Sequence, residues 1–106
     1  MAKWIDAVGE KEIAPGDKRC LTVAGFPIIL YNVDGKLAAT YNICPHAGLP
    51  IGDGDLVGGV ISCPFHAYTY DVCTGRNIDD PDAERLMTIR LRCQDGRVEV
   101  ELPVVE

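Results

Sequence analysis

Both histidines of this 106-residue chain stand beside a cysteine, in two short motifs. The first motif is Cys44-x-His46, and the second, Cys63-x-x-His66, is separated from it by sixteen residues. Thiolates and imidazoles are the side chains that bind zinc and iron in many proteins. Because each motif supplies one ligand of each type, the pattern indicates a metal site built from two loops.

The residue types alone allow three interpretations of the motifs. The side chains could be core cysteines and histidines without a metal, although two mixed pairs are a poor fit to that reading. They could form a structural zinc site, but small zinc modules usually pair cysteine with cysteine and histidine with histidine. They could also bind a [2Fe–2S] cluster in which one iron has two thiolates and the other has two imidazoles.

The elements that position these motifs are predicted to be β-strands. Turn signals separate short runs of β-branched and apolar residues, and Asp34-Gly35 and Asp95-Gly96 are strong hairpin signals. On either side of the second hairpin, residues alternate between apolar and polar, which predicts half-buried antiparallel strands. We expect an all-β antiparallel sandwich or incomplete barrel of about seven to nine strands. The expected strands are 19–24, 26–33, 37–41, 59–63, 67–72, 86–93 and 97–102.

Two long segments without strand patterning interrupt this β domain, at 42–59 and 74–84. The first contains the Cys44-x-His46 motif, and the second follows the Cys63-x-x-His66 motif closely. Irregular segments of this length in a compact domain are usually functional. We therefore expect the binding region to occupy about residues 42–84 of a single domain.

Composition excludes several classes of function. The formal net charge is −6, whereas nucleic acids and anionic membrane surfaces attract basic proteins. The charged N-terminal residues leave no apolar core of signal-peptide length, and no run reaches the roughly 18 apolar residues of a membrane helix. Five cysteines are an odd number, which argues against a complete disulfide framework. These features predict a cytoplasmic protein that binds neither nucleic acid nor membrane.

The spacing Cys44-x-His46 and Cys63-Pro64-x-His66 resembles the signature of the Rieske family. The likeness extends through "HAGLPIGDGDLVGGVISCPFHAYTYDVCTG" and into "NIDDPDAERL", which is similar to the family's proline-containing loop over the cluster. Nearly the whole chain is covered, so residues 1–106 resemble a free-standing Rieske-type ferredoxin with a two-loop cluster-binding subdomain. The resemblance implies one [2Fe–2S] cluster and four cofactor-binding metal ligands: Cys44, His46, Cys63 and His66.

The chain departs from the family pattern at several positions. Leu49 and Phe65 replace the two further cysteines that respiratory-complex Rieske proteins join as a disulfide. Ala67 replaces a common glycine, and Tyr68 replaces a serine that donates a hydrogen bond to a bridging sulfide in the high-potential branch. Tyr70 matches a tyrosine that donates to a cysteine sulfur. The resemblance therefore implies a potential toward the low end of the family range, which is about −150 to +300 mV.

The resemblance implies an electron carrier rather than an enzyme. Electrons would come from a flavin-dependent reductase and go to a terminal oxygenase of an aromatic-ring dioxygenase system, and no organic substrate would bind. Two alternatives remain at this stage: a small Rieske-type subunit of an assimilatory nitrite reductase, and a zinc-stabilised binding module.

The surroundings of the motifs lead to two further expectations. We expect the outer edges of His46 and His66 to form the electron port, with four apolar residues around it: Leu49, Pro50, Phe65 and Pro81. The acidic residues of the second long segment would steer a basic partner. Among the other cysteines, Cys20 and Cys93 lie in strand-like runs and are expected to be small buried hydrophobes, and Cys73 has no counterpart among the family's ligands.

Overall fold

The computed structural model describes residues 2–45, 48–65 and 68–104. These residues form ten strands and one 3₁₀ turn at Glu10–Glu12, without an α-helix. The strands are β1 Lys3–Gly9, β2 Lys18–Val23, β3 Phe26–Val33, β4 Lys36–Tyr41, β5 Leu56–Val57, β6 Val60–Ser62, β7 Thr69–Asp71, β8 Thr88–Ile89, β9 Leu91–Gln94 and β10 Arg97–Leu102. Over the same residues, no helix is long and apolar enough to cross a membrane.

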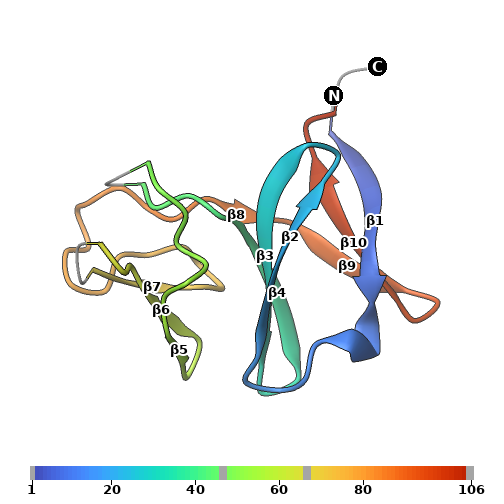
Figure 1. Cartoon of the computed structure of the whole chain (residues 1–106), viewed down its shortest axis with the longest axis horizontal. Coiled ribbons are helices and arrows are strands. Elements are labelled where there is room, and N and C mark those ends of the chain that lie inside the picture. The colour runs from blue at the N-terminus through green and yellow to red at the C-terminus, as the bar shows by residue number, and fades with distance from the viewer. Residues whose placement is uncertain (1, 46–47, 66–67, 105–106) are drawn as a thin grey trace.

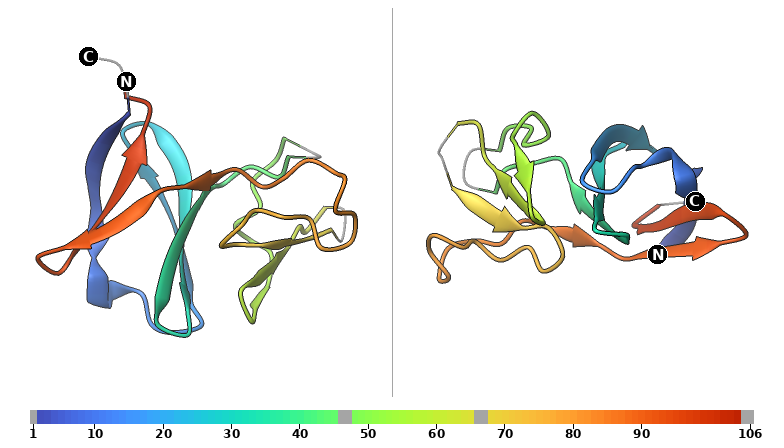
Figure 2. Two further views of the ribbon diagram at one scale, coloured as in Figure 1. Left: turned by 180° about the vertical axis from the view of Figure 1, so that it is seen from behind. Right: turned by 90° about the horizontal axis from the view of Figure 1, so that it is seen from below.

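The strands form three antiparallel sheets, as Figures 1 and 2 show. The first sheet has the order β1-β10-β9, the second β2-β3-β4-β8 and the third β5-β6-β7. The first two sheets face one another, and the third, smaller sheet lies beside them with the long loops. This arrangement confirms the expected all-β fold, and it is an open sandwich because the described strands do not close into a barrel.

Strand β3 joins the two parts of the molecule because both of its faces are buried. Ile28, Ile29, Leu30 and Tyr31 all have 0% exposed surface. Successive side chains of a strand point to opposite faces. Ile28 and Leu30 therefore lie in the core between the two larger sheets, whereas Ile29 and Tyr31 lie in a second core with Cys44 and Cys63.

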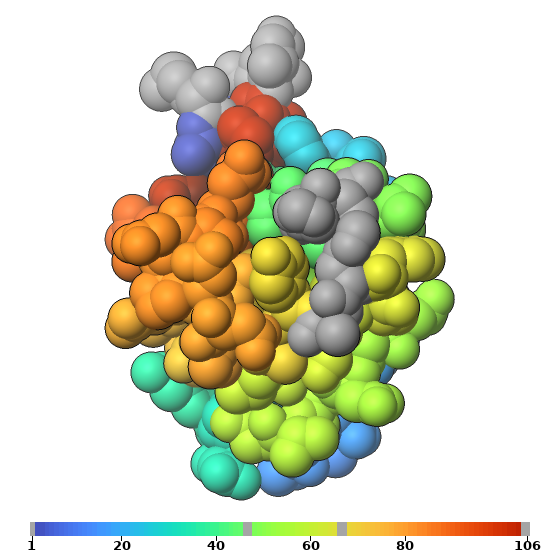
Figure 3. Space-filling model, turned by 90° about the vertical axis from the view of Figure 1, so that its left-hand side faces the viewer, coloured from blue at the N-terminus to red at the C-terminus, as the bar shows by residue number. Residues whose placement is uncertain are grey.

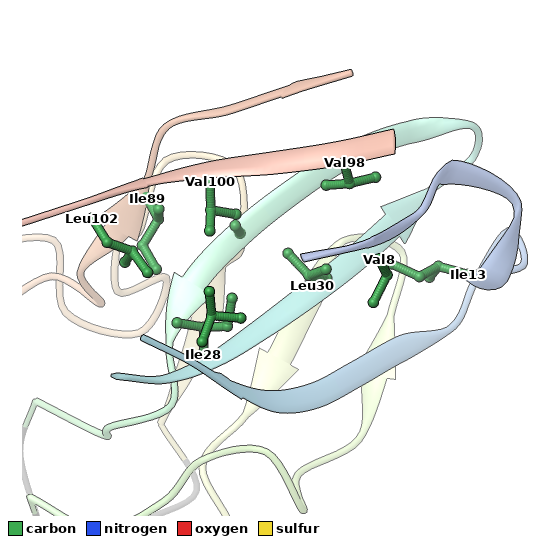
Figure 4. Packing of buried hydrophobic residues seen from close by; sticks show 10 residues of the cluster. Val8, Ile13, Ile28, Leu30, Ile89, Val98, Val100 and Leu102 are labelled. Atoms are coloured by element: carbon green, nitrogen blue, oxygen red, sulfur yellow. The ribbon is translucent and has the colours of Figure 1, made fainter. Parts of the chain in front are cut away.

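The core of the sandwich consists of aliphatic side chains from both large sheets (Figure 4). Val98, Val100 and Leu102 alternate with more exposed residues along β10, as period two predicts for a half-buried strand. They meet Ile28 and Leu30 from β3. This core holds the long strands in place, and Cys44 and Cys63 pack against the other face of β3.

The two predicted hairpin turns are confirmed by the backbone. Asp34 and Gly35 have φ values of 52° and 94°, and Asp95 and Gly96 have 53° and 76°. A two-residue turn with positive φ at both positions has the twist that suits an antiparallel hairpin. The first turn joins β3 to β4, and the second joins β9 to β10.

The number and bounds of the strands differ from the prediction. The run 86–93 was expected to form one strand, but Arg90 divides it into β8 and β9. Ile89 pairs with Ala39 of β4, whereas Leu91 pairs with Val100 of β10, so the chain passes from one sheet to the other at this point. Strands β1 and β5 were not among the predicted runs, because β1 is interrupted by an irregular register and β5 has only two residues.

The prediction that Cys20 and Cys93 are buried was wrong. Both are exposed and neither forms a disulfide. Cys20 lies on β2 and Cys93 on β9, and each of these strands is at the edge of its sheet. An edge strand has a neighbour on one side only, so an apolar sequence context does not guarantee burial there.

Gly75, in the segment that follows β7, lies close to the backbone of Leu86. A substitution at Gly75 tests this close approach. Its φ is +81°, and a Cβ at this position would overlap the carbonyl oxygen of Leu86. Gly96, with φ +76° and open space around it, is a matched control. We expect Gly96→Ala to lower the free energy of unfolding by about 1–2 kcal/mol through the left-handed backbone alone. Gly75→Ala should lose at least twice as much in chemical denaturation, and equal losses would contradict the close approach.

Candidate metal centre

Cys44 and Cys63 meet in the second core, although nineteen positions separate them in sequence. Cys44 follows β4 and Cys63 follows β6 directly, and their exposed fractions are 0% and 2%. Their Sγ atoms lie 3.1 Å apart, well beyond the S–S bond of about 2.05 Å in a disulfide. Two thiolates on one tetrahedral metal would lie about 3.8 Å apart, from metal–sulfur bonds of about 2.3 Å. A small widening of this pair would therefore admit a shared metal ion.

The first loop, residues 42–55, is held by hydrogen bonds around Cys44. The amide N–H of Cys44 donates to the carbonyl oxygen of Leu49, and the N–H of Gly48 donates to that of Cys44, both at 2.7 Å. Farther along, Oδ1 of Asn42 accepts hydrogen bonds from the backbone N–H groups of Ile51 at 2.9 Å and Gly52 at 2.7 Å. These bonds close the loop on both sides of the first motif.

The second loop, residues 63–68, closes in the same way. The N–H of Cys63 donates to the carbonyl oxygen of Tyr68 at 2.8 Å. The first loop packs against β6, the strand that leads into the second loop, because a Cβ at Gly54 would overlap the carbonyl oxygen of Ser62. The backbone therefore brings the two loops together. His46 and His66, the other two predicted ligands, lie outside the described residues, as does Ala67.

Tyr70 of β7 lies against the first cysteine. Its side chain is 1% exposed, and its hydroxyl group is hydrogen bonded to Cys44. Burial and the neighbouring Cys44 raise the pKa of Tyr70 well above its usual range, so the hydroxyl keeps its proton. This is the contact with a cysteine sulfur that was expected from the sequence.

Residues 76–86, called the covering segment below, return the chain from β7 towards β8. The side chain of Asp79 accepts hydrogen bonds from the backbone N–H of Thr69 at 2.7 Å and from its hydroxyl at 2.8 Å. These bonds hold the pKa of Asp79 below its usual value, the backbone bond having the larger effect. Figure 3 looks onto this end of the molecule, where the covering segment (orange) lies beside the two loops.

Sequence reasoning did not single out the two asparagines that organise this region. Asn42 binds two N–H groups of the first loop, and Asn77 binds those of Asp79 and Asp80 in the covering segment. The bonds of Asn77 form a turn of the kind that asparagine readily makes with its own following backbone, whereas those of Asn42 reach nine and ten residues along the chain. An asparagine next to a loop rich in glycine or aspartate was therefore the available signal.

Comparison with known proteins finds relatives over nearly the whole chain. The model of the family "Rieske [2Fe-2S] domain" matches residues 3–94. The chain is 41% identical over 100 residues to the ferredoxin component of the naphthalene 1,2-dioxygenase system of Pseudomonas aeruginosa, covering 94% of this chain and 96% of that protein. It is 31% identical to ferredoxin CarAc of Metapseudomonas resinovorans, with 92% of each chain covered.

Solved structures show the same likeness. The chain resembles one chain of the complex of reduced oxygenase and oxidised ferredoxin in carbazole 1,9a-dioxygenase, with a TM-score of 0.83 and 31% identity. That match covers 92% of this chain and 91% of the other. It also resembles the Sphingomonas yanoikuyae B1 ferredoxin, with a TM-score of 0.80, 27% identity and coverage of 95% and 100%.

The contact between Tyr70 and Cys44 predicts the redox behaviour of iron bound to this sulfur. A hydrogen-bond donor stabilises the more negative, reduced state, so Tyr70→Phe should lower the reduction potential. A hydrogen bond to a charged group contributes roughly 1.5–3 kcal/mol, and only the part that differs between redox states appears as a shift. Voltammetry of the wild type and the variant measures it, and an unchanged or higher potential would remove Tyr70 from the tuning of this site.

Proposed function

The chain belongs to the family of Rieske [2Fe–2S] domains, and on that premise we propose that it binds one [2Fe–2S] cluster. The observation that supports this most directly is the meeting of two buried thiols from separate loops, 3.1 Å apart. They fit the two thiolate ligands of one iron. His46 and His66 complete the set by their places in the two motifs, so the proposed ligands are Cys44, His46, Cys63 and His66.

The ligand types define what the site contributes chemically. When bound, a cluster of this kind accepts and releases one electron. Two thiolates and two neutral imidazoles leave the oxidised cluster with no net charge, whereas four thiolates would leave it at −2. An electron enters a neutral site at lower energetic cost, so histidine ligation raises the potential. The burial of Cys44 and Cys63 keeps water away from the sulfur atoms.

The protein carries single electrons to a terminal ring-hydroxylating oxygenase and does not itself catalyse a reaction. The similarity to ferredoxin components of dioxygenase systems covers nearly the whole of both chains, which favours a free carrier over a subunit of an assimilatory nitrite reductase. We further propose a flavin-dependent reductase as the electron donor. Residues 1–106 act as one domain in this proposal, because β3 is shared by both cores.

A cytoplasmic location is part of the same proposal. All five cysteines lie among the described residues and are free of disulfides, which suits a reducing compartment. Cys73 is exposed as well as Cys20 and Cys93, so three thiols face the solvent.

The ligand assignment is tested by substituting alanine at each of the four positions in turn. Each variant should lose bound iron and sulfide together with the visible absorption of the cluster, because a missing ligand opens one iron to water and exchange. Cys73→Ala, which removes an exposed thiol, is the matched control and should retain the full cluster. A variant of any of the four that keeps a full and spectrally unchanged cluster shows that the residue is not a ligand.

The surface around the loops is suited to brief contact with another protein. Leu49 and Phe65 are 44% and 52% exposed, and Pro50 and Pro81 are also exposed. Leu49, Pro50 and Phe65 belong to the two ligand loops and Pro81 to the covering segment, so this surface offers apolar contact to a partner close to the proposed cluster. Four acidic residues of the covering segment are exposed too: Asp79, Asp80, Asp82 and Glu84. Charges around an interface mainly raise the rate of association.

The carrier function predicts that Leu49→Glu slows electron transfer without changing the cluster spectrum. A charge buried in an apolar contact should cost at least about 1.4 kcal/mol, which corresponds to a tenfold lower second-order rate with the partner. Val57→Glu is the control, because it adds the same charge at an exposed position away from the ligand loops. Val57 is 74% exposed and lies on β5. The wild-type rate should also fall as salt screens the acidic residues. A rate that responds to neither the substitution nor salt would favour a permanently bound subunit.

A further inference from the structure

The side-chain amide of Asn77 has one hydrogen-bonding group left unused. Asn77 is 1% exposed, and its Oδ1 accepts hydrogen bonds from the N–H groups of Asp79 and Asp80, both at 2.9 Å. Its Nδ2 is the only buried side-chain nitrogen or oxygen without a partner among the described residues. The two bonds to Oδ1 determine the orientation of the amide, because a flipped amide would set its NH₂ group against two other donors.

A cavity of about 130 Å³ lies beside this amide. The described residues that line it present both polar and apolar groups: Pro45, Tyr68, Tyr70, Asn77, Ala83 and Glu84. One internal water needs only about 10–15 Å³ of such volume and two to four polar partners. A buried donor without a partner in a native protein usually has an internal water as its acceptor. The cavity therefore has both the room and the chemistry to hold water against Asn77.

Asn77 also faces Tyr70 directly. The two residues form an isolated antiparallel bridge. The flanking bonds run from the N–H of Asp71 to the carbonyl of Arg76 at 2.9 Å and from the N–H of Ile78 to that of Thr69 at 2.8 Å. This pattern makes Tyr70 and Asn77 a non-hydrogen-bonded pair, in which the side chains lie on the same face at the closer of the two spacings.

We propose that Asn77 is a positioning residue that holds an internal water against Tyr70 and thereby supports the hydrogen bond from Tyr70 to Cys44. The water accepts a hydrogen bond from Nδ2 of Asn77 and donates one to the hydroxyl oxygen of Tyr70. Bonds in such a chain polarise one another, so the tyrosine becomes a stronger donor to the sulfur. Asn77 thus raises the reduction potential without contacting the cluster, an inference that rests on the proposed function.

The test displaces the water while leaving Asn77 in place. Ala83→Leu fills the cavity with an apolar side chain, and Ala83→Ser is the matched control that leaves the room for water. We expect Ala83→Leu to lower the reduction potential and the denaturation midpoint of the cluster-loaded protein, because Nδ2 of Asn77 loses its partner. Ala83→Ser should leave both near the wild-type values. A potential that does not fall, or a higher midpoint, as filling a dry cavity would give, overturns the proposal.

A double-mutant cycle separates the water from other effects of a larger side chain. Asn77→Ser removes the Nδ2 donor and keeps a hydroxyl that can accept from the covering segment. It should lower the potential by itself, and adding Ala83→Leu should lower it no further, because the water is already lost. Equal effects of Ala83→Leu in both backgrounds would overturn the inference. Failure of the proposed function looks different, since the wild-type protein would then contain no iron or sulfide to reduce.

Discussion

The burial of β3 on both faces is the constraint on which the rest of the molecule depends. Ile28 and Leu30 pack into the sandwich, and Ile29 and Tyr31 pack into the core that contains the two cysteines. One strand therefore transmits the rigidity of the long antiparallel sheets to a region made mainly of loops. Tyr31 is buried even at its polar end, because its hydroxyl is hydrogen bonded to Thr40 of β4 at 2.8 Å. A polar replacement in this strand would disturb both cores together.

The loop region has little regular structure, and its order comes from backbone groups that are hydrogen bonded within the region itself. The three strands β5, β6 and β7 have only two or three residues each. Two asparagine side chains, Asn42 and Asn77, each bind a pair of backbone N–H groups in the way that a further strand would. Irregular backbone arranged in this way can bend around a metal cofactor, where a continuous sheet could not. The order of the loops therefore depends on these hydrogen bonds rather than on regular strand pairing.

The same construction suits electron transfer better than catalysis. Four protein ligands leave the iron atoms of a Rieske cluster without an open position for a substrate. What such a protein needs is a shielded metal centre close to a surface that meets its partners briefly. Buried cysteines, exposed apolar loop residues and an acidic covering segment provide these features within 106 residues.

The sequence by itself determined the family, the all-β class and the two hairpins at Asp34-Gly35 and Asp95-Gly96, because each of these depends on patterns of residue types along the chain. Only the tertiary structure decided where strands meet and what is buried. The chain changes sheets at Arg90, and Cys20 and Cys93 are exposed, because each outcome depends on which distant strand lies alongside. The meeting of Cys44 with Cys63, and the burial of the Asn77 amide beside Tyr70, likewise come from contacts between separate loops, and no local pattern encodes those distances.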